Sequence, residues 1–404
     1  MKIVVLKFGG TSVGTIEKIK KVASIIGNYR KKNYKVIVVS SAMSGVTNDL
    51  IKKSRQISKN FSESEYDVLV SSGEQVACSL IAGRLKYNGF KSRSWLGWQI
   101  PILTQGPHKN SRINQINKNK IISYLKEGGI PIITGFQGMN NDQRITTIGR
   151  GGSDASAIML AKFFKAQRCV IYTDVEGVYT TDPNKFNKAK KIKVISYEEM
   201  LEMASLGAKV MQPVSIQDAR LNRIDIEVKS SFIKKSGTLI TKKSNIINSK
   251  IVTGITSTYN DSKVTLVGVK DKPGVAASIF KPLSTNSINV DMVVQNISAN
   301  GKETDLTFTI KTEDLNKTKK IIIDNKRINF KKLLFDKGVS KISIIGVGMI
   351  TTPGVTFRMF QALANKKINI QVISTSEIKI SVLVDKKDTK KALIVLHKEF
   401  KLNK

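Results

Sequence analysis

Two glycine-rich turns carry residue types that can hold phosphate and carboxylate groups. Lys7-Phe8-Gly9-Gly10 closes an apolar run near the N-terminus, and Arg150-Gly151-Gly152-Ser153-Asp154 opens a helix-like stretch. Paired glycines let the backbone approach a ligand closely, and free amides beside a lysine suit phosphate oxygens. The planar guanidinium of an arginine suits a carboxylate. Each turn taken alone also fits an ordinary helix start, and the lysine turn lacks the Walker A spacing of a P-loop.

A carboxylate and an acidic loop complete the candidate functional residues. Ser72-Gly73-Glu74 is expected to start an apolar helix, where Glu74 either complements the helix dipole or pairs with a ligand ammonium. The segment Tyr172–Pro183 follows an apolar strand and contains acidic residues, Tyr179 and Pro183. It predicts either a loop around a nucleotide base and ribose or an ordinary connection. Thr11 or Ser12 is expected to cap the helix after the first turn.

The elements that position these residues follow an α/β pattern. Residues 1–235 alternate short apolar runs with amphipathic stretches, which is typical of a sheet layered by helices. The expected strands are Ile3–Leu6, Val36–Val39, Ile130–Thr134, Cys169–Thr173 and Ile226–Val228. The expected helices include Ile16–Tyr29, Glu74–Lys86, Asp154–Phe164 and Glu198–Leu206. Ligands of open α/β sheets bind beyond the carboxyl ends of the strands, which is where the turns Phe8-Gly9-Gly10, Ser40-Ser41-Ala42 and Gly135-Phe136-Gln137-Gly138 must lie.

The C-terminal part contains an internal repeat. Lys272-Pro273-Gly274-Val275 recurs as Thr352-Pro353-Gly354-Val355, and Ile288-Asn289-Val290 recurs as Ile368-Asn369-Ile370, each 80 residues later. An apolar strand precedes each Pro-Gly turn, and further strands follow each helix-like segment. Two copies of a βαββ-type unit are therefore predicted.

Composition narrows the class of protein. The net charge of +36 raises a nucleic-acid hypothesis, but lysines are scattered along the chain and aromatic residues make up only 6%. A solvated basic surface without a nucleic-acid partner is the favoured interpretation. No apolar stretch approaches the ~20 residues that span a bilayer, and no signal peptide is evident. Cys78 and Cys169 are expected to be buried thiols of a cytoplasmic protein, and His108 and His397 are expected at the surface.

These motifs, with Ser41-Ala42-Met43 and Gly135-Phe136-Gln137-Gly138, resemble in order and spacing the aspartate kinases of the amino-acid-kinase superfamily. The repeat resembles their tandem ACT domains. The resemblance implies an α/β chain with a three-layer α/β/α kinase domain in residues 1–240 and a linker in 241–250. It further implies two βαββ-type, ferredoxin-like ACT domains, the first (264–336) inserted into the second (251–263 and 337–404).

The resemblance also implies an activity. The γ-phosphoryl group of ATP, with Mg²⁺, would pass to the side-chain carboxylate of L-aspartate and give 4-phospho-L-aspartate, the first step of lysine, threonine and methionine biosynthesis. An aspartate carboxylate is already ionised at pH 7, so no general base is needed, and alignment and charge neutralisation suffice. The residues carried over as catalytic are Lys7, Gly9, Gly10, Arg150 and Asp154. Those for ATP are Lys7, Phe8, Gly9, Gly10, Ser41, Thr173, Asp174, Tyr179, Asp182, Pro183 and Lys209. Those for aspartate are Thr47, Glu74, Arg150, Gly151, Gly152, Ser153 and Asp154.

Feedback regulation is the last implication. The ACT pair would form a homo-oligomer and bind lysine, threonine or both. The effector residues carried over are Asp271, Gly274, Val275, Ala276, Ala277, Ser278, Asn289, Val290, Asp291, Gln295, Asn369 and Ile370. Two alternatives stay open: a related kinase acting on glutamate or acetylglutamate, and a catalytically inactive amino-acid sensor.

Overall fold

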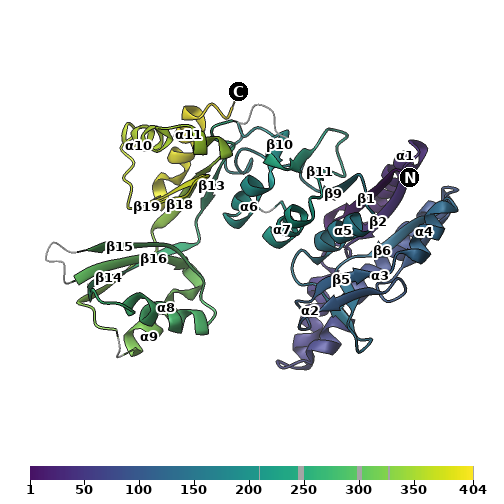
Figure 1. Ribbon diagram of the computed structural model, residues 1–404, viewed down its shortest axis with the longest axis horizontal. Coiled ribbons are helices and arrows are strands. Elements are labelled where there is room, and N and C mark those ends of the chain that lie inside the picture. Colours follow the sequence, from purple (N-terminus) through teal and green to yellow (C-terminus); the bar gives the residue numbers. More distant parts are fainter. Residues whose placement is uncertain (209, 244–249, 298–302, 326–327, 404) are drawn as a thin grey trace. The chain divides into compact units, whose positions relative to one another are not determined.

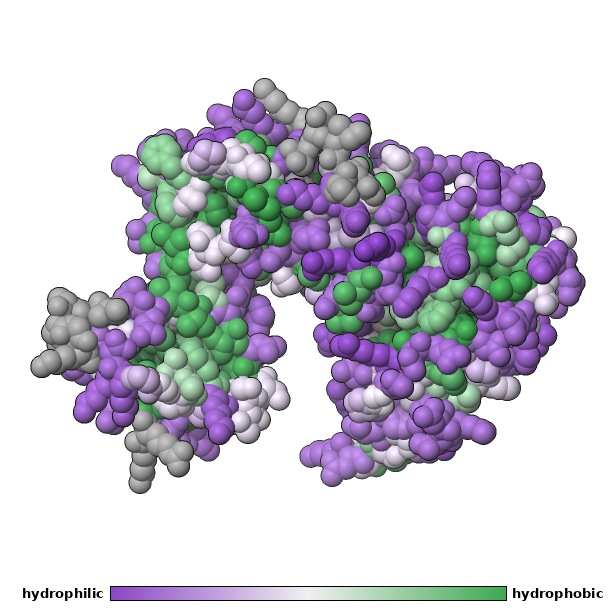
Figure 2. Space-filling model, viewed as in Figure 1, coloured by the Kyte–Doolittle hydropathy of each residue, from purple (hydrophilic) through white to green (hydrophobic). Residues whose placement is uncertain are grey.

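The computed structural model describes residues 1–208, 210–243, 250–297, 303–325 and 328–403 (Figure 1). The chain divides into two compact units. The N-terminal unit comprises Met1–Val178, Lys191–Ser205 and Lys209–Asn248, and the C-terminal unit comprises Tyr179–Lys190, Leu206–Ala208 and Ser249–Lys404. Hydrophilic residues cover most of the face shown in Figure 2, as expected from the many lysines. None of the described helices is long and apolar enough to cross a membrane.

An eight-stranded sheet forms the centre of the N-terminal unit, in the order β10-β12-β11-β9-β1-β2-β6-β3. Neighbouring strands are parallel except for the antiparallel pair β11–β12. The strands are β1 (Ile3–Phe8), β2 (Lys35–Ser40), β3 (Ser92–Trp95), β6 (Ile130–Thr134), β9 (Arg168–Thr173), β10 (Val194–Ser196), β11 (Ile226–Ser230) and β12 (Thr238–Thr241). All six residues of β1 are buried, as a parallel strand covered on both faces requires. The five strands predicted from apolar runs are confirmed.

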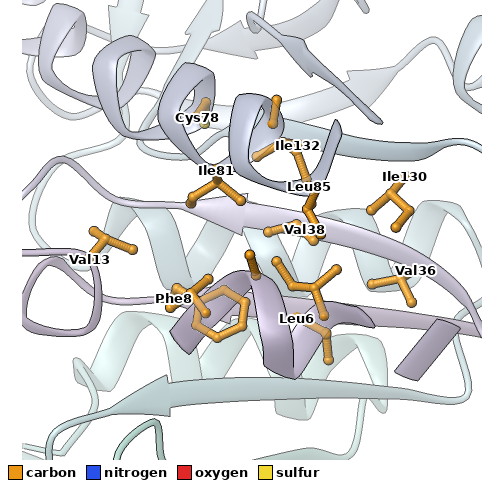
Figure 3. Close-up of a cluster of buried hydrophobic side chains, with 14 of the residues drawn as sticks. Leu6, Phe8, Val13, Val36, Val38, Cys78, Ile81, Leu85, Ile130 and Ile132 are labelled. Carbon is orange, nitrogen blue, oxygen red and sulfur yellow. The ribbon is translucent and has the colours of Figure 1, made fainter. Parts of the chain in front are cut away.

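Helices cover the two faces of this sheet. They are α1 (Ile16–Lys31), α2 (Val46–Ile57), α3 (Glu63–Tyr87), α4 (Asn119–Lys126), α5 (Gly152–Phe163), α6 (Tyr197–Ser205) and α7 (Pro213–Asn222). Leu6 and Phe8 of β1 pack with α1 and α3, whose Cys78, Ile81 and Leu85 are visible in Figure 3. Because side chains alternate along a strand, Lys7 points to the opposite face, where α5 lies. The predicted three-layer architecture is confirmed.

The start of α3 and the cap of α1 differ from the prediction, whereas the two cysteines agree with it. The helix predicted to start at Glu74 begins at Glu63 instead. Its first turn was missed because the turn is polar and partly exposed and therefore shows no apolar periodicity. Neither Thr11 nor Ser12 caps α1: Gly10–Ser12 forms a 3-10 turn, and the side chain of Thr15 accepts from the Lys18 amide. Cys78 and Cys169 are free and buried, as predicted.

A smaller sheet lies beside the main one in the N-terminal unit. Its order is β5-β4-β7-β8, from β4 (Ile102–Gln105), β5 (Arg112–Ile116), β7 (Gln137–Met139) and β8 (Ile145–Thr147). β8 leads directly into the Arg150 turn and α5, so this sheet fixes the position of that turn.

The C-terminal unit holds two antiparallel four-stranded sheets with separate cores. The first has the order β15-β16-β14-β17, from β14 (Asp261–Lys270), β15 (Val290–Ile297), β16 (Glu303–Lys311) and β17 (Lys332–Asp336), with α8 (Val275–Thr285) and α9 (Leu315–Asp324). The second has the order β13-β18-β20-β19, from β13 (Gly254–Thr258), β18 (Val339–Ile345), β19 (Val372–Thr375) and β20 (Lys379–Asp385), with α10 (Val355–Ala364) and α11 (Thr389–Glu399). β13 precedes the first sheet in the chain but pairs with β18.

The sequence repeat corresponds to these two modules. Gly274 and Gly354 precede α8 and α10 in the same left-handed conformation, with φ of +88° and +83°. A residue with a side chain is strained there, which explains why both copies of the Pro-Gly turn have glycine. The prediction of two related units is confirmed.

The loop Tyr179–Lys190 belongs to the C-terminal unit and packs on the second module. The amide of Ile255 donates to the Thr180 carbonyl at 2.7 Å, and the Thr180 hydroxyl lies 2.8 Å from Nε2 of His397 on α11. Phe186 packs edge-on against the same imidazole. His397 is therefore only 1% exposed, and the expectation of a surface histidine is wrong because α11 turns this residue toward the loop.

Candidate active site

Lys7 and Asp154 form a buried ion pair across the end of the main sheet. Nζ of Lys7 lies 2.6 Å from Oδ1 of Asp154 in the first turn of α5, and both side chains are about one-tenth exposed. The backbone is closely packed here, since a Cβ on Gly10 would lie 2.9 Å from the Ala42 carbonyl oxygen. This approach brings the first turn against the residues that follow β2. The lysine is thus held at a fixed place beside the closely packed Gly9-Gly10 turn.

A cavity of about 580 Å³ opens at these strand ends. The predicted site residues that line it are Lys7, Gly10, Ser41, Thr47, Glu74, Arg150, Gly151, Gly152, Ser153 and Asp154. They come from β1, the residues after β2, α2, α3 and the start of α5. Segments far apart in sequence therefore meet in one polar cavity, as the sequence predicts for residues at the carboxyl ends of strands.

Glu74 is buried near the middle of α3, with only 3% of its surface exposed. Its Oε1 accepts from the Ala42 amide at 3.1 Å, while Oε2 is buried without a hydrogen-bond partner among the described residues. Burial raises the pKa of Glu74 to about 7. The helix-dipole interpretation is wrong, because the residue lies far from the helix N-terminus. A buried carboxylate oxygen that faces a cavity without a donor suits a cationic ligand group.

The Arg150 turn lines the same cavity. Gly151 precedes α5 with φ of +76°, and the amide of Asp154 donates to its carbonyl at 2.9 Å. Ser153 is buried, whereas Arg150 is exposed and also lines the cavity. The turn therefore places a guanidinium beside the start of a helix, and both attract carboxylates.

The remaining nucleotide candidates do not line this cavity. Phe8 stacks on Tyr172 in the core, and Gly9 donates its amide to the Tyr172 carbonyl. Thr173 ends β9 and Asp174 follows it in the same unit, where the threonine hydroxyl donates to the aspartate at 3.0 Å. Tyr179, Asp182 and Pro183 lie in the C-terminal unit. Lys209 lies outside the described residues.

The effector candidates are spread over both modules of the C-terminal unit. Asn289 and Val290 line a cavity of about 300 Å³ with Phe280 and Val293. The candidates at the first Pro-Gly turn and the start of α8 do not line it; they are Asp271, Gly274, Val275, Ala276, Ala277 and Ser278. Gln295 lies further along β15, and Asn369 and Ile370 lie before β19.

Asp291 joins the two modules instead of facing a cavity. Its carboxylate pairs with Lys341 of β18, which is 5% exposed. Burial opposes ionisation of Asp291, but the lysine charge and hydrogen bond outweigh it and hold its pKa below the ordinary value. This residue therefore already has a cationic partner.

Several residues around the substrate-side cavity escaped sequence analysis. Tyr66, Lys109 and Arg55 line it, and Asp67 contacts His108 and the lining residue Lys109. Asp67 precedes Glu74 by seven residues, two helical turns, so both carboxylates belong to one face of α3. That spacing was a usable signal once the helix was known to extend back to Glu63.

Comparisons with known proteins agree with this geometry. The amino acid kinase family model matches residues 2–230, and an ACT domain model matches residues 264–325 and 342–400. An aspartate kinase of Pseudomonas putida is 44% identical over 405 residues, covering 100% of this chain and 98% of the relative. Aspartokinase 2 of Bacillus subtilis is 41% identical over 405 residues, covering 100% of this chain and 99% of the relative.

Solved structures give the same result. Aspartokinase III of E. coli in complex with aspartate and ADP superposes with a TM-score of 0.78 at 26% identity, covering 98% of this chain and 99% of that one. The same enzyme with lysine and aspartate gives 0.82 at 26% identity, covering 99% and 100%. With near-complete coverage in sequence and structure, the chain belongs to the amino acid kinase family, among the aspartate kinases that carry C-terminal ACT domains.

Proposed function

We propose that the cavity beside β1 and β2 is where the γ-phosphoryl group of ATP passes to the side-chain carboxylate of L-aspartate. The observation that carries this proposal is the unpartnered, buried Oε2 of Glu74 in the same cavity as the Arg150 turn. An α-amino acid brings one ammonium and one α-carboxylate, which match these two groups in charge. Its side-chain carboxylate is then free to face the lysine end of the cavity.

The phosphate end rests on Lys7, the Gly9-Gly10 turn and Ser41. The ion pair with Asp154 holds the Lys7 ammonium in place and leaves its other N–H groups for phosphate oxygens. Phosphoryl transfer depends on alignment and on neutralising charge that spreads over the transferred group. Lys7 and the Gly10 amide would supply both, and no side chain has to accept a proton from the ionised acceptor.

Mg²⁺ would add charge neutralisation on the phosphates. The described residues contain no group of three or more His, Cys, Asp or Glu side chains that could hold a metal ion. Asp154 and Glu74 are the carboxylates that line the cavity. The ion is therefore expected to arrive with ATP, held mainly by phosphate oxygens and water, as is usual for nucleotide kinases.

We also propose feedback regulation through the C-terminal unit. One structural relative was solved with lysine bound, and the ACT modules here offer the Asn289 cavity. Lysine, threonine or both are the proposed effectors, and assembly as a homo-oligomer through the ACT sheets and a cytoplasmic location stay predictions. The measurement is activity against each amino acid and their mixture.

A substrate panel tests the proposed reaction. L-Aspartate, L-glutamate and N-acetylglutamate are each incubated with ATP and Mg²⁺, and the acyl phosphate is trapped with hydroxylamine. Of the three acceptors, we expect only L-aspartate to give a product. N-Acetylglutamate has an amide in place of the ammonium, so it would leave Glu74 Oε2 unpaired. Preference for either other acceptor overturns the assignment, and no product with any acceptor favours the inactive sensor.

A further inference from the structure

Asp67 is a wholly buried carboxylate that the proposed chemistry does not use. It lies on α3 with 0% of its surface exposed. Oδ1 accepts from the Thr147 hydroxyl at 2.6 Å, and both oxygens accept from the Lys109 amide at 3.1 Å. Oδ2 lies 2.7 Å from Nδ1 of His108, which must donate because an ionised carboxylate has only acceptors. Three donors from two other segments thus converge on one side chain.

These contacts tie together the two walls of the substrate cavity. α3 carries both Asp67 and Glu74, while Thr147 ends β8, three residues before Arg150. The loop of Lys109 also supports the arginine turn, because the amide of Ser111 donates to the Thr147 carbonyl at 3.0 Å. Asp67 therefore connects α3, which carries Glu74, to β8, which leads to Arg150.

We propose that Asp67 is a positioning residue for the amino-acid substrate, which holds Arg150 opposite Glu74 without touching the substrate. This inference rests on the proposed function, in which those two residues bind the ammonium and the α-carboxylate. A carboxylate is required because every partner is a donor. The side-chain amide of Asn has the same shape but must turn its NH₂ donor toward at least one of these donors. Asp67→Asn is therefore expected to lose at least one of the three hydrogen bonds.

The first test is Asp67→Asn in the full-length protein. The KM for aspartate should rise on the order of tenfold, as for loss of one coupled contact, while kcat and the KM for ATP stay within about twofold. This split matters because general destabilisation would lower the active fraction and hence kcat, leaving both KM values unchanged. Such a result, or no change in any parameter, contradicts the proposal.

A double-mutant cycle tests whether Asp67 acts through Arg150. In an Arg150→Ala background, Asp67→Asn should raise the aspartate KM by less than about twofold, because the group it positions is gone. In a Glu74→Gln background the effects should multiply, since Ala42 holds Glu74 by a separate bond. Effects that multiply in both backgrounds overturn this inference alone. If Arg150→Ala by itself leaves the aspartate KM unchanged, the substrate assignment and the inference both fail.

Adjacent threonines on β8 supply a matched control. Thr147→Val removes a buried hydrogen bond to Asp67, and Thr146→Val removes an equally buried one to Thr104 at 2.6 Å. Both should lower the melting temperature, but only Thr147→Val should raise the aspartate KM. An equal rise in both variants would mark a structural role. If Asp67→Asn does not fold, this pair and His108→Ala, whose imidazole is 22% exposed, carry the test.

Discussion

The ammonium of Lys7 and the carboxylate of Asp154 face each other at 2.6 Å, one from the central strand β1 and one from the first turn of α5. The pair joins the Gly9-Gly10 turn to the Arg150 turn, although the two residues are far apart in the chain. A buried pair of this kind is costly to break from one side, because the remaining charge loses its partner. Both residues are therefore expected to matter for rate and for local order.

Lys7→Ala should lower kcat by on the order of 10²–10³, as for removal of one electrostatic partner of the transition state. The KM for aspartate should change much less, because the lysine serves charge on the phosphates. Steady-state kinetics with both substrates varied gives the result. Lys7→Arg should not restore activity, since a planar fork does not fit beside Gly10 and Asp154. Near-normal kcat in Lys7→Ala would remove the phosphate role.

Glu74 predicts a pH dependence of aspartate binding. Its pKa lies at about 7 in the folded protein, and only the ionised form attracts an ammonium. The kcat/KM for aspartate should therefore rise with pH through about 7 and level off above it. Glu74→Gln should remove this rise and weaken aspartate binding roughly ten- to hundredfold, with ATP binding almost unchanged. Initial rates at low aspartate between pH 5.5 and 8.5 test this, and an unchanged profile in the variant would assign the titration elsewhere.

The same group predicts a stability change of definite sign. A carboxyl whose folded-state pKa is raised from 4.5 to about 7 binds its proton more tightly when folded. Its contribution to stability is therefore lost as pH rises from about 4.5 to about 7, and the ionised form stays costly above that. Glu74→Gln should be more stable than the parent at pH 8, by on the order of 3 kcal/mol without ligand. Chemical denaturation at pH 5 and pH 8 measures the difference, which should nearly vanish at pH 5.

Sequence reasoning was strongest where one physical rule acts alone. The apolar runs of β1, β2 and β9 predicted buried parallel strands because such strands are covered on both faces. The turns after Phe8, Ser40 and Thr134 were predicted to lie together because the carboxyl ends of strands in an open sheet share one edge, and Gly10, Ser41 and Phe136 line one cavity. Both predictions needed only local patterns and a general topological rule.

Sequence patterns did not predict the features that depend on tertiary contacts. The first turn of α3 is polar, so no apolar periodicity predicted it. Asp67, which follows this turn, was therefore not recognised as a helix residue. The loop Tyr179–Lys190 is continuous in sequence with Asp174 but packs on α11 through Thr180 and His397. Hydrogen bonds between residues 217 apart leave no mark in composition or spacing.

His397 predicts acid sensitivity of the C-terminal unit. Burial lowers its pKa from 6.5 to about 4, with a smaller effect of the Lys250 charge. The unfolded state therefore takes up a proton that the folded state refuses, so stability should fall as pH drops from about 6.5 towards 4. His397→Gln can keep a hydrogen bond to Thr180 and does not titrate. Its melting temperature should fall less than that of the parent between pH 7 and pH 5, and parallel curves would contradict the assignment.

The last prediction concerns the effector. Asn289 lines the cavity of the first module, and its counterpart in the repeat, Asn369, is exposed before β19. If the cavity amide hydrogen-bonds the effector, Asn289→Ala should cost roughly 1–3 kcal/mol of effector binding and shift the inhibition curve to about ten times higher concentration. Uninhibited kcat and KM should stay within about twofold, because the residue lies outside the kinase unit. Asn286→Ala is the matched control, since its side-chain amide donates to the Pro282 carbonyl at the end of α8 and Asn286 is not among the described residues that line the cavity. Activity is measured against lysine, threonine and their mixture for the parent and the variants, with Asn369→Ala as a third. If Asn289→Ala is inhibited like the parent while Asn369→Ala is not, the effector binds through the second module and the cavity plays no part in it.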